Sequence, residues 1–172
     1  SFFEAVKVVM DFAKKDKNTL VVITSDHGNA NPGLIYGGKT NDNFDHLQKF
    51  THSNDWVLQG IHASSSTSFV KDRIAEACGG FAITDEQAKE LLSYYNNLKK
   101  EDGLYNHKNL PFRALAEMQK AYTSVGWISM DHSSDYTELA MYGPGSENLK
   151  SFIRNTDMHN FLLNAAHVEN KF

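Results

Sequence analysis

The sequence has little of what would mark several large classes of protein. A single cysteine, Cys78, excludes a disulfide within the chain. No apolar run approaches the roughly 20 residues of a membrane-spanning helix. The 17 Lys and Arg residues are scattered and the net charge is −4, so nothing indicates nucleic-acid binding. There is no repeat and no low-complexity tract. We therefore expect no membrane span and no nucleic-acid partner.

The composition that is present suits a folded domain. Apolar residues make up 41% of the 172 residues and aromatic residues 12%, which fits a globular core and argues against disorder. The length allows one domain or part of a larger one. Ser1 leads directly into an amphipathic helical pattern with neither an initiator Met nor a signal peptide, so we expect a piece of a longer protein.

The two ends of the chain show the alternation of an α/β fold. Apolar residues recur with helical period over residues 2–15, and residues 20–24 form an almost wholly apolar strand of the kind buried in parallel sheets. Strand patterns return at residues 126–130 and 136–142. Thr156 or Asp157 then caps a last helix. We expect an α/β core made of residues 1–30 and 125–172.

The segment between these ends, residues 31–124, reads as an inserted subdomain that is mostly helical. Its Gly- and Asn-rich start predicts irregular loop. The later patterns predict a strand over Trp56–Ile61, a helix over Ser64–Cys78, a helix from the capping box at Thr84 to about Lys100, and a helix from Pro111 onward.

The residues that carry chemistry lie where the apolar strand ends. Asp26 and His27 follow it directly, and Gly28 lets the backbone turn. A carboxylate and an imidazole can hold a divalent ion such as zinc, and open α/β sheets bind ligands at the carboxyl ends of their strands. His132, between two later strand patterns, would join them if adjacent parallel strands brought their ends together. A turn cap and a surface histidine are the alternative interpretations of these residues.

Other candidate residues favour ordinary structural roles. His46, His52, His62 and His107 are irregularly spaced in the insertion, and we interpret them as solvated or locally hydrogen-bonded. The Ser-rich run at residues 64–68 lacks the glycine elbow of a nucleophile and reads as a helix entry. Cys78 reads as a small buried hydrophobe near a helix end.

Three motifs, in order, resemble the alkaline phosphatases. They are residues 18–27, which end in Thr24-Ser25-Asp26-His27, then residues 125–136 with the Tyr-Gly-Pro-Gly turn at 142–145, and residues 155–159. The resemblance covers both ends of the chain, roughly half of it. It implies a three-layer α/β/α sandwich core with the insertion as a crown or lid that often contributes to a dimer interface.

The resemblance also implies an activity and its cofactors. Alkaline phosphatases hydrolyse small-molecule phosphate monoesters through a phosphoenzyme, with two Zn²⁺ and one Mg²⁺. By this resemblance Asp26 and His27 bind the zinc that activates the nucleophile, and His132 binds the other zinc. It implies a homodimeric parent protein in a periplasmic or extracellular location. The Ser or Thr nucleophile, the Mg²⁺ ligands and two ligands of one zinc are expected upstream of Ser1, so the chain alone is expected to be inactive.

Two alternatives stay open at this point. Residues 28–31, Gly-Asn-Ala-Asn, resemble cofactor-independent phosphoglycerate mutases of the same superfamily. We rank these second because their next histidine comes much sooner and they lack the Tyr-Gly-Pro-Gly turn. The other alternative is a non-catalytic binding or assembly module that kept the scaffold.

Overall fold

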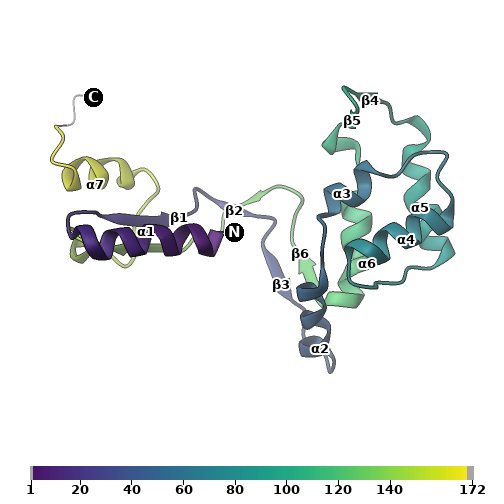
Figure 1. Cartoon of the computed structure of the whole chain (residues 1–172), viewed down its shortest axis with the longest axis horizontal. Coiled ribbons are helices and arrows are strands. Elements are labelled where there is room, and N and C mark those ends of the chain that lie inside the picture. The colour runs from purple at the N-terminus through teal and green to yellow at the C-terminus, as the bar shows by residue number, and fades with distance from the viewer. Residues whose placement is uncertain (1, 170–172) are drawn as a thin grey trace. The chain divides into compact units, whose positions relative to one another are not determined.

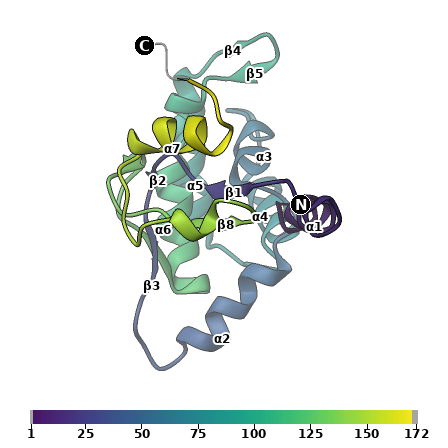
Figure 2. The same ribbon diagram turned by 90° about the vertical axis from the view of Figure 1, so that its left-hand side faces the viewer.

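The computed structural model describes residues 2–169, and these divide into two compact units. The first unit contains residues 2–29 and 132–169, and the second contains residues 30–131. Figure 1 shows the elements of each unit in the colours of the chain, and Figure 2 shows them from the side. The two ends of the chain therefore belong to one unit, and the segment between them builds the other.

The first unit is built around a short antiparallel ladder. Its elements are α1 (Phe2–Asp16), β1 (Val21–Thr24), β2 (Gly28–Asn29), β7 (His132–Ser133), β8 (Leu139–Tyr142), a 3₁₀ turn (Ser146–Asn148) and α7 (Asp157–Ala165). β1 pairs with β8 from Val21↔Tyr142 to Thr24↔Leu139. The predicted parallel pairing is thus wrong for the described strands. An apolar run such as residues 20–24 indicates a strand, but it does not indicate the direction of the partner strand.

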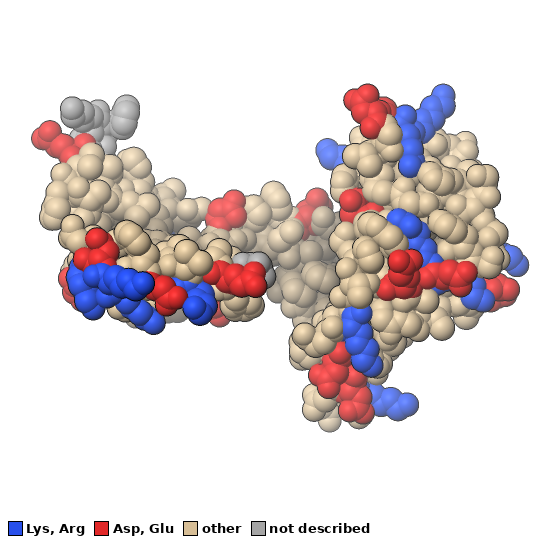
Figure 3. All heavy atoms as spheres, viewed as in Figure 1, with Lys and Arg blue, Asp and Glu red and all other residues tan. Residues whose placement is uncertain are grey.

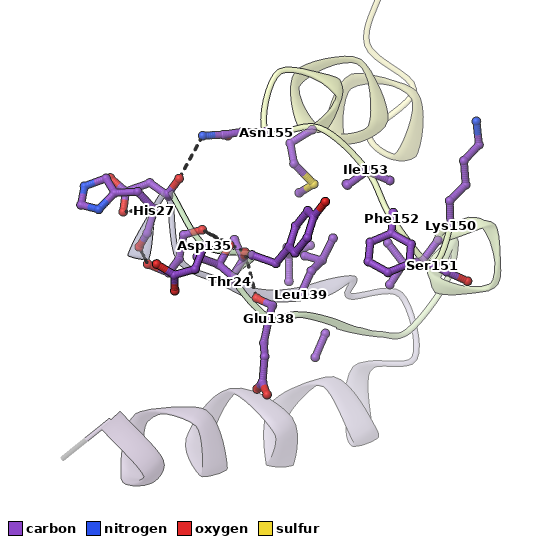
Figure 4. A pocket seen from close by; sticks show the side chains of 18 of the residues that line it. Thr24, His27, Asp135, Glu138, Leu139, Lys150, Ser151, Phe152, Ile153 and Asn155 are labelled. Carbon is purple, nitrogen blue, oxygen red and sulfur yellow. Dashed lines mark hydrogen bonds and ion pairs between the residues drawn. The ribbon is translucent and has the colours of Figure 1, made fainter. Parts of the chain in front are cut away.

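Helices lie on both faces of this ladder. Figure 4 shows α1 on one side of β1 and β8 and α7 on the other, which is an α/β/α arrangement. A cavity of about 990 Å³ lies between the ladder and α7, with Phe152, Met158 and Leu162 in its wall. Among the described residues of this unit, Ala13 and Val21 are the buried hydrophobic ones. The first unit therefore has a thin core.

The second unit is helical with short ladders. Its elements are β3 (Pro32–Leu34), α2 (Thr40–Phe44), α3 (Asn54–Gln59), α4 (Thr67–Ala77), α5 (Asp85–Ser93), β4 (Lys100–Glu101), β5 (Leu104–Tyr105), α6 (Phe112–Thr123) and β6 (Val125–Trp127), with 3₁₀ turns at Asp45–Lys49, Tyr94–Asn97 and His107–Asn109. β3 pairs with β6, and β4 pairs with β5, both antiparallel.

Capping explains the agreements and the errors in this unit. The Thr84 capping box is confirmed: Gln87 N donates to Thr84 Oγ1 and Thr84 N donates to Gln87 Oε1. α5 is nevertheless shorter than expected, because a 3₁₀ turn follows Ser93. The strand predicted over Trp56–Ile61 is wrong. Ser53 Oγ accepts from Trp56 N and starts helix α3 there, and a short apolar run alone cannot separate helix from strand.

A continuous hydrophobic core fills the second unit. Leu58, Ile74, Leu91 and Leu115 are completely buried in it. Tyr95 is buried with its hydroxyl donating to Leu58 O at 2.8 Å, and burial raises the pKa of Tyr95.

Cys78, at the carboxyl end of α4, is buried in the same core as expected. Burial raises the pKa of the Cys78 thiol, which opposes the reactive thiolate form.

The helices and charges fit the expectations from composition. Within residues 2–169, no helix has the length and apolar character needed to cross a bilayer. On the face drawn in Figure 3, the basic side chains that gather on α1 are interleaved with acidic ones. Lys7 and Asp11, one helical turn apart, form one such pair at 3.0 Å. The remaining charges on that face are scattered.

Candidate metal centre

Strands β2 and β7 bring the two motif histidines together. Asn29 faces His132 and Gly28 faces Ser133 in this antiparallel ladder. Because side chains alternate along a strand, His27 lies on the same face as Asn29 and is therefore a diagonal neighbour of His132. The two imidazole rings stack with their centroids 3.9 Å apart and their planes at 28°. The neighbourhood that was expected from parallel strands is thus produced by an antiparallel pair.

Asp26 and His27 form a compact pair of donors at the end of β1. His27 N donates to Asp26 Oδ1 at 3.1 Å, and Asp26 Oδ2 lies 3.3 Å from His27 Nε2. His27 Nδ1 lies 2.8 Å from Gly28 O, which can only accept, so this contact is a hydrogen bond in the tautomer that carries the proton on Nδ1. In the neutral ring this leaves the lone pair on Nε2, on the side of the carboxylate.

The separation of these donors fits a tetrahedral zinc ion. Zinc bonds of about 2.0–2.2 Å to nitrogen and oxygen place two tetrahedral ligands roughly 3.3–3.5 Å apart. Asp26 Oδ2 and His27 Nε2 are 3.3 Å apart. The side chains of His27 and Asp26 are 40% and 78% exposed, so an ion can reach both.

The described residues supply only part of a metal site. Across residues 2–169, no group of three or more His, Cys, Asp or Glu side chains is arranged to hold an ion. Asp26 and His27 could give two ligands to one ion, and His132 could give one ligand to a neighbouring ion. Structural zinc normally takes four ligands and catalytic zinc three plus an open position, so a zinc ion at either place would need ligands beyond these three side chains.

Gly28 leaves room for side chains beside this pair. A Cβ at Gly28 would overlap Asp135 Oδ1 and would lie 2.6 Å from Ser133 Oγ. Ser133 Oγ is buried and has no hydrogen-bond partner among the described residues. Ser133 and Asp135 lie on the face of the ladder opposite the stacked rings. The missing side chain of Gly28 therefore makes the close packing of this turn possible.

Gly28→Ala is expected to destabilise the first unit by about 1 kcal/mol. The added methyl group would clash with Ser133, which is fixed in β7. The cost is at the lower end for overpacking because the exposed side chain of Asp135 can turn away. Denaturant unfolding followed by circular dichroism measures this change. Gly33→Ala is the matched control, since nothing lies within 4 Å of its added Cβ, and it should stay within about 0.5 kcal/mol. Equal effects of the two substitutions would contradict the steric argument.

The four histidines of the insertion have local partners. His46 Nδ1 lies 2.8 Å from Tyr122 O, His52 stacks on Trp56, His62 Nδ1 lies 3.1 Å from Tyr105 Oη, and His107 Nδ1 lies 3.6 Å from Asp55. Their interpretation as locally bonded residues is consistent with these contacts.

Two further residues lie close to Asp26 and His27 but were not predicted as site residues from the sequence. Asp135 packs against Gly28, and Asn155 Nδ2 donates to Asp26 O at 3.2 Å. Figure 4 shows Asn155 reaching from the α7 side toward the turn that carries His27. Both residues belong to the segments that resemble the alkaline phosphatases. Their place in these motifs is the sequence signal that indicates a role near the site.

Comparison with known proteins identifies the family to which the chain is similar. The alkaline phosphatase family model matches residues 1–168. Alkaline phosphatase 4 of Bacillus subtilis is 28% identical over 94% of this chain, and alkaline phosphatase 3 of the same organism is 26% identical over 91%. The chain spans about a third of each relative, 32%.

Solved structures show the same fold. The crystal structure of Thermus thermophilus alkaline phosphatase matches 97% of this chain and 38% of its own, with a TM-score of 0.80 and 19% identity. A cold-active alkaline phosphatase from Shewanella matches 96% of this chain and 38% of its own, with a TM-score of 0.63 and 16% identity. The expected α/β fold class is confirmed, and the chain belongs to the alkaline phosphatase family.

Proposed function

We propose that this chain is the carboxyl-terminal part of a metal-dependent phosphomonoesterase, in which Asp26, His27 and His132 are zinc ligands. Membership of the alkaline phosphatase family supports phosphatase-type chemistry. The stack of His27 on His132, 3.9 Å between centroids, carries the assignment of residues. It places the ligands proposed for the two ions side by side, as neighbouring ions roughly 3.5–4 Å apart require.

The residues of this chain would divide between the two ions. Asp26 and His27 would hold the ion beside the attacking group, and His132 would hold the ion beside the leaving group. Two bound Zn²⁺ ions would supply charge stabilisation for the attacking and leaving oxygens of an in-line displacement. Gly28 O would fix the tautomer of His27 by accepting from Nδ1, and Asp26 would offset part of the positive charge.

The other parts of this proposed site would lie on segments outside the chain, which covers about a third of its relatives. These parts are the Ser or Thr nucleophile, the remaining zinc ligands and the carboxylates of one Mg²⁺. We also propose that the second unit is the counterpart of the family's crown subdomain, that the whole protein is a homodimer and that it is periplasmic or extracellular. All of these rest on family resemblance.

The protein that contains this chain is expected to hydrolyse p-nitrophenyl phosphate, to lose this activity on chelation and to regain it with Zn²⁺ and Mg²⁺. Steady-state assays before and after dialysis against EDTA measure this. The isolated chain serves as the negative control and should not turn over, because the proposed nucleophile lies on a segment outside it. Manganese-dependent interconversion of phosphoglycerates without ester hydrolysis would instead support the mutase alternative, and turnover by the isolated chain would contradict the proposed division of the site.

A further inference from the structure

The turn that precedes α7 is held in a defined shape. Arg154 N donates to Asp157 Oδ2 at 3.1 Å, and Asp157 N donates to Arg154 O at 2.9 Å. Met158 N donates to Asn155 O at 3.2 Å. These bonds hold the backbone on both sides of Asn155 and therefore the direction of its Cα–Cβ bond.

That direction leads to the metal-ligand loop, 129 residues away in sequence. Asn155 Nδ2 donates to Asp26 O at 3.2 Å, as Figure 4 shows by a dashed line. The Asp26 carbonyl is part of the peptide bond that joins Asp26 to His27. Because this peptide is planar, a bond to its oxygen restrains the plane from which both ligand side chains extend.

Two further bonds hold this loop through Ser25, the residue before the pair. Thr137 Oγ1 donates to Ser25 O at 3.1 Å, and Ser25 Oγ donates to His27 O at 2.8 Å. They tie the loop to the segment before β8 and to itself. The bond from Asn155 ties the loop to the turn before α7, on the other side of the cavity.

We propose that Asn155 is a positioning residue for the metal site: its amide holds the Asp26–His27 peptide so that the carboxylate and the imidazole face one ion. This inference rests on the proposed function. It gives the segment at residues 155–157 a role. Asp157 holds the shape of the turn, and Asn155 hydrogen-bonds from this turn to the metal-ligand loop. Groups that orient metal ligands typically contribute about 10- to 100-fold to metal affinity. Because Asn155 makes a single neutral hydrogen bond, we expect its contribution to be about tenfold.

Two substitutions in the protein that contains this chain separate the donor from its charge. Asn155→Ala removes the donor. Asn155→Asp keeps the shape, removes the donor and adds a negative charge that would by itself favour a cation. We expect both variants to bind zinc about tenfold more weakly, measured by competition with a chromophoric chelator, with unchanged stoichiometry at saturation. Asn164→Ala and Asn164→Asp, at an exposed position on α7, are the matched controls and should bind like the unsubstituted protein.

The thermal midpoint of the metal-free protein distinguishes positioning from general stability. The Asn155 variants should unfold at the same temperature as the Asn164 controls. Unchanged zinc affinity in both Asn155 variants would overturn the inference, as would weaker binding accompanied by an equal loss of metal-free stability. If the unsubstituted protein binds no stoichiometric zinc, the proposed function itself fails, which is a different result.

Discussion

His27→Ala, in the protein that contains this chain, is expected to bind one zinc ion fewer and to lose at least about 10³-fold in kcat/KM for p-nitrophenyl phosphate. The ring supplies one of the two donors 3.3 Å apart, and Asp26 alone would leave the ion with a single ligand from this loop. A catalytic ion contributes several kcal/mol of transition-state stabilisation, and about 4 kcal/mol corresponds to 10³-fold in rate.

Metal analysis and steady-state kinetics on the same preparations measure both effects. Asp26→Ala should behave like His27→Ala, and His132→Ala should remove the other zinc ion. His159→Ala is the matched control because His159 is exposed on α7. If all three variants kept full zinc content and activity, these residues would not be the zinc ligands. The binding or assembly module instead predicts no stoichiometric zinc in the unsubstituted protein.

Leu91→Ala is expected to lower the stability of the second unit by about 2–5 kcal/mol, because Leu91 is completely buried in α5 and the cavity cannot fill without moving its neighbours. For a unit of this size the loss corresponds to a fall in melting temperature of roughly 10–30 °C. Tryptophan fluorescence reports on this unit alone, since Trp56 and Trp127, the two tryptophans of the chain, both lie in it.

Leu162→Ala provides the matched comparison. Leu162 is 44% exposed on α7 of the first unit, so the same truncation removes less buried surface there. The fluorescence transition should be nearly unchanged in this variant. A similar fall in both variants would mean that the second unit has no stability of its own.

Local signals in the sequence predicted local structure well. The capping box at Thr84 and Gln87 forms as expected, because its two hydrogen bonds join residues three positions apart. Asp157, one of the two residues proposed to start the last helix, accepts from Arg154 N, while Thr156 makes no side-chain cap bond. The strand predicted over Trp56–Ile61 is largely helix α3 instead, because the side chain of Ser53 caps a helix at this point.

Contacts between segments far apart in the sequence could not be predicted from such local signals. The apolar run at Val21–Thr24 is compatible with either strand direction, and its antiparallel partner at Leu139–Tyr142 is set by tertiary pairing. The bond from Asn155 ends on a main-chain carbonyl, and every residue has one. No pattern of side chains could therefore have identified Asp26 as its acceptor.

The chain leaves the first unit after Asn29 and returns at His132, and these two residues face each other in the β2–β7 ladder. In terms of topology, the whole second unit is the loop of a β-hairpin. The entropy of closing a loop grows only logarithmically, by about 0.6 kcal/mol for each doubling in length. A longer, shorter or unrelated loop could thus replace residues 30–131 without a change of register at Gly28 and His132. Such a hairpin allows the inserted domain to diversify while the imidazole pair at its root is retained.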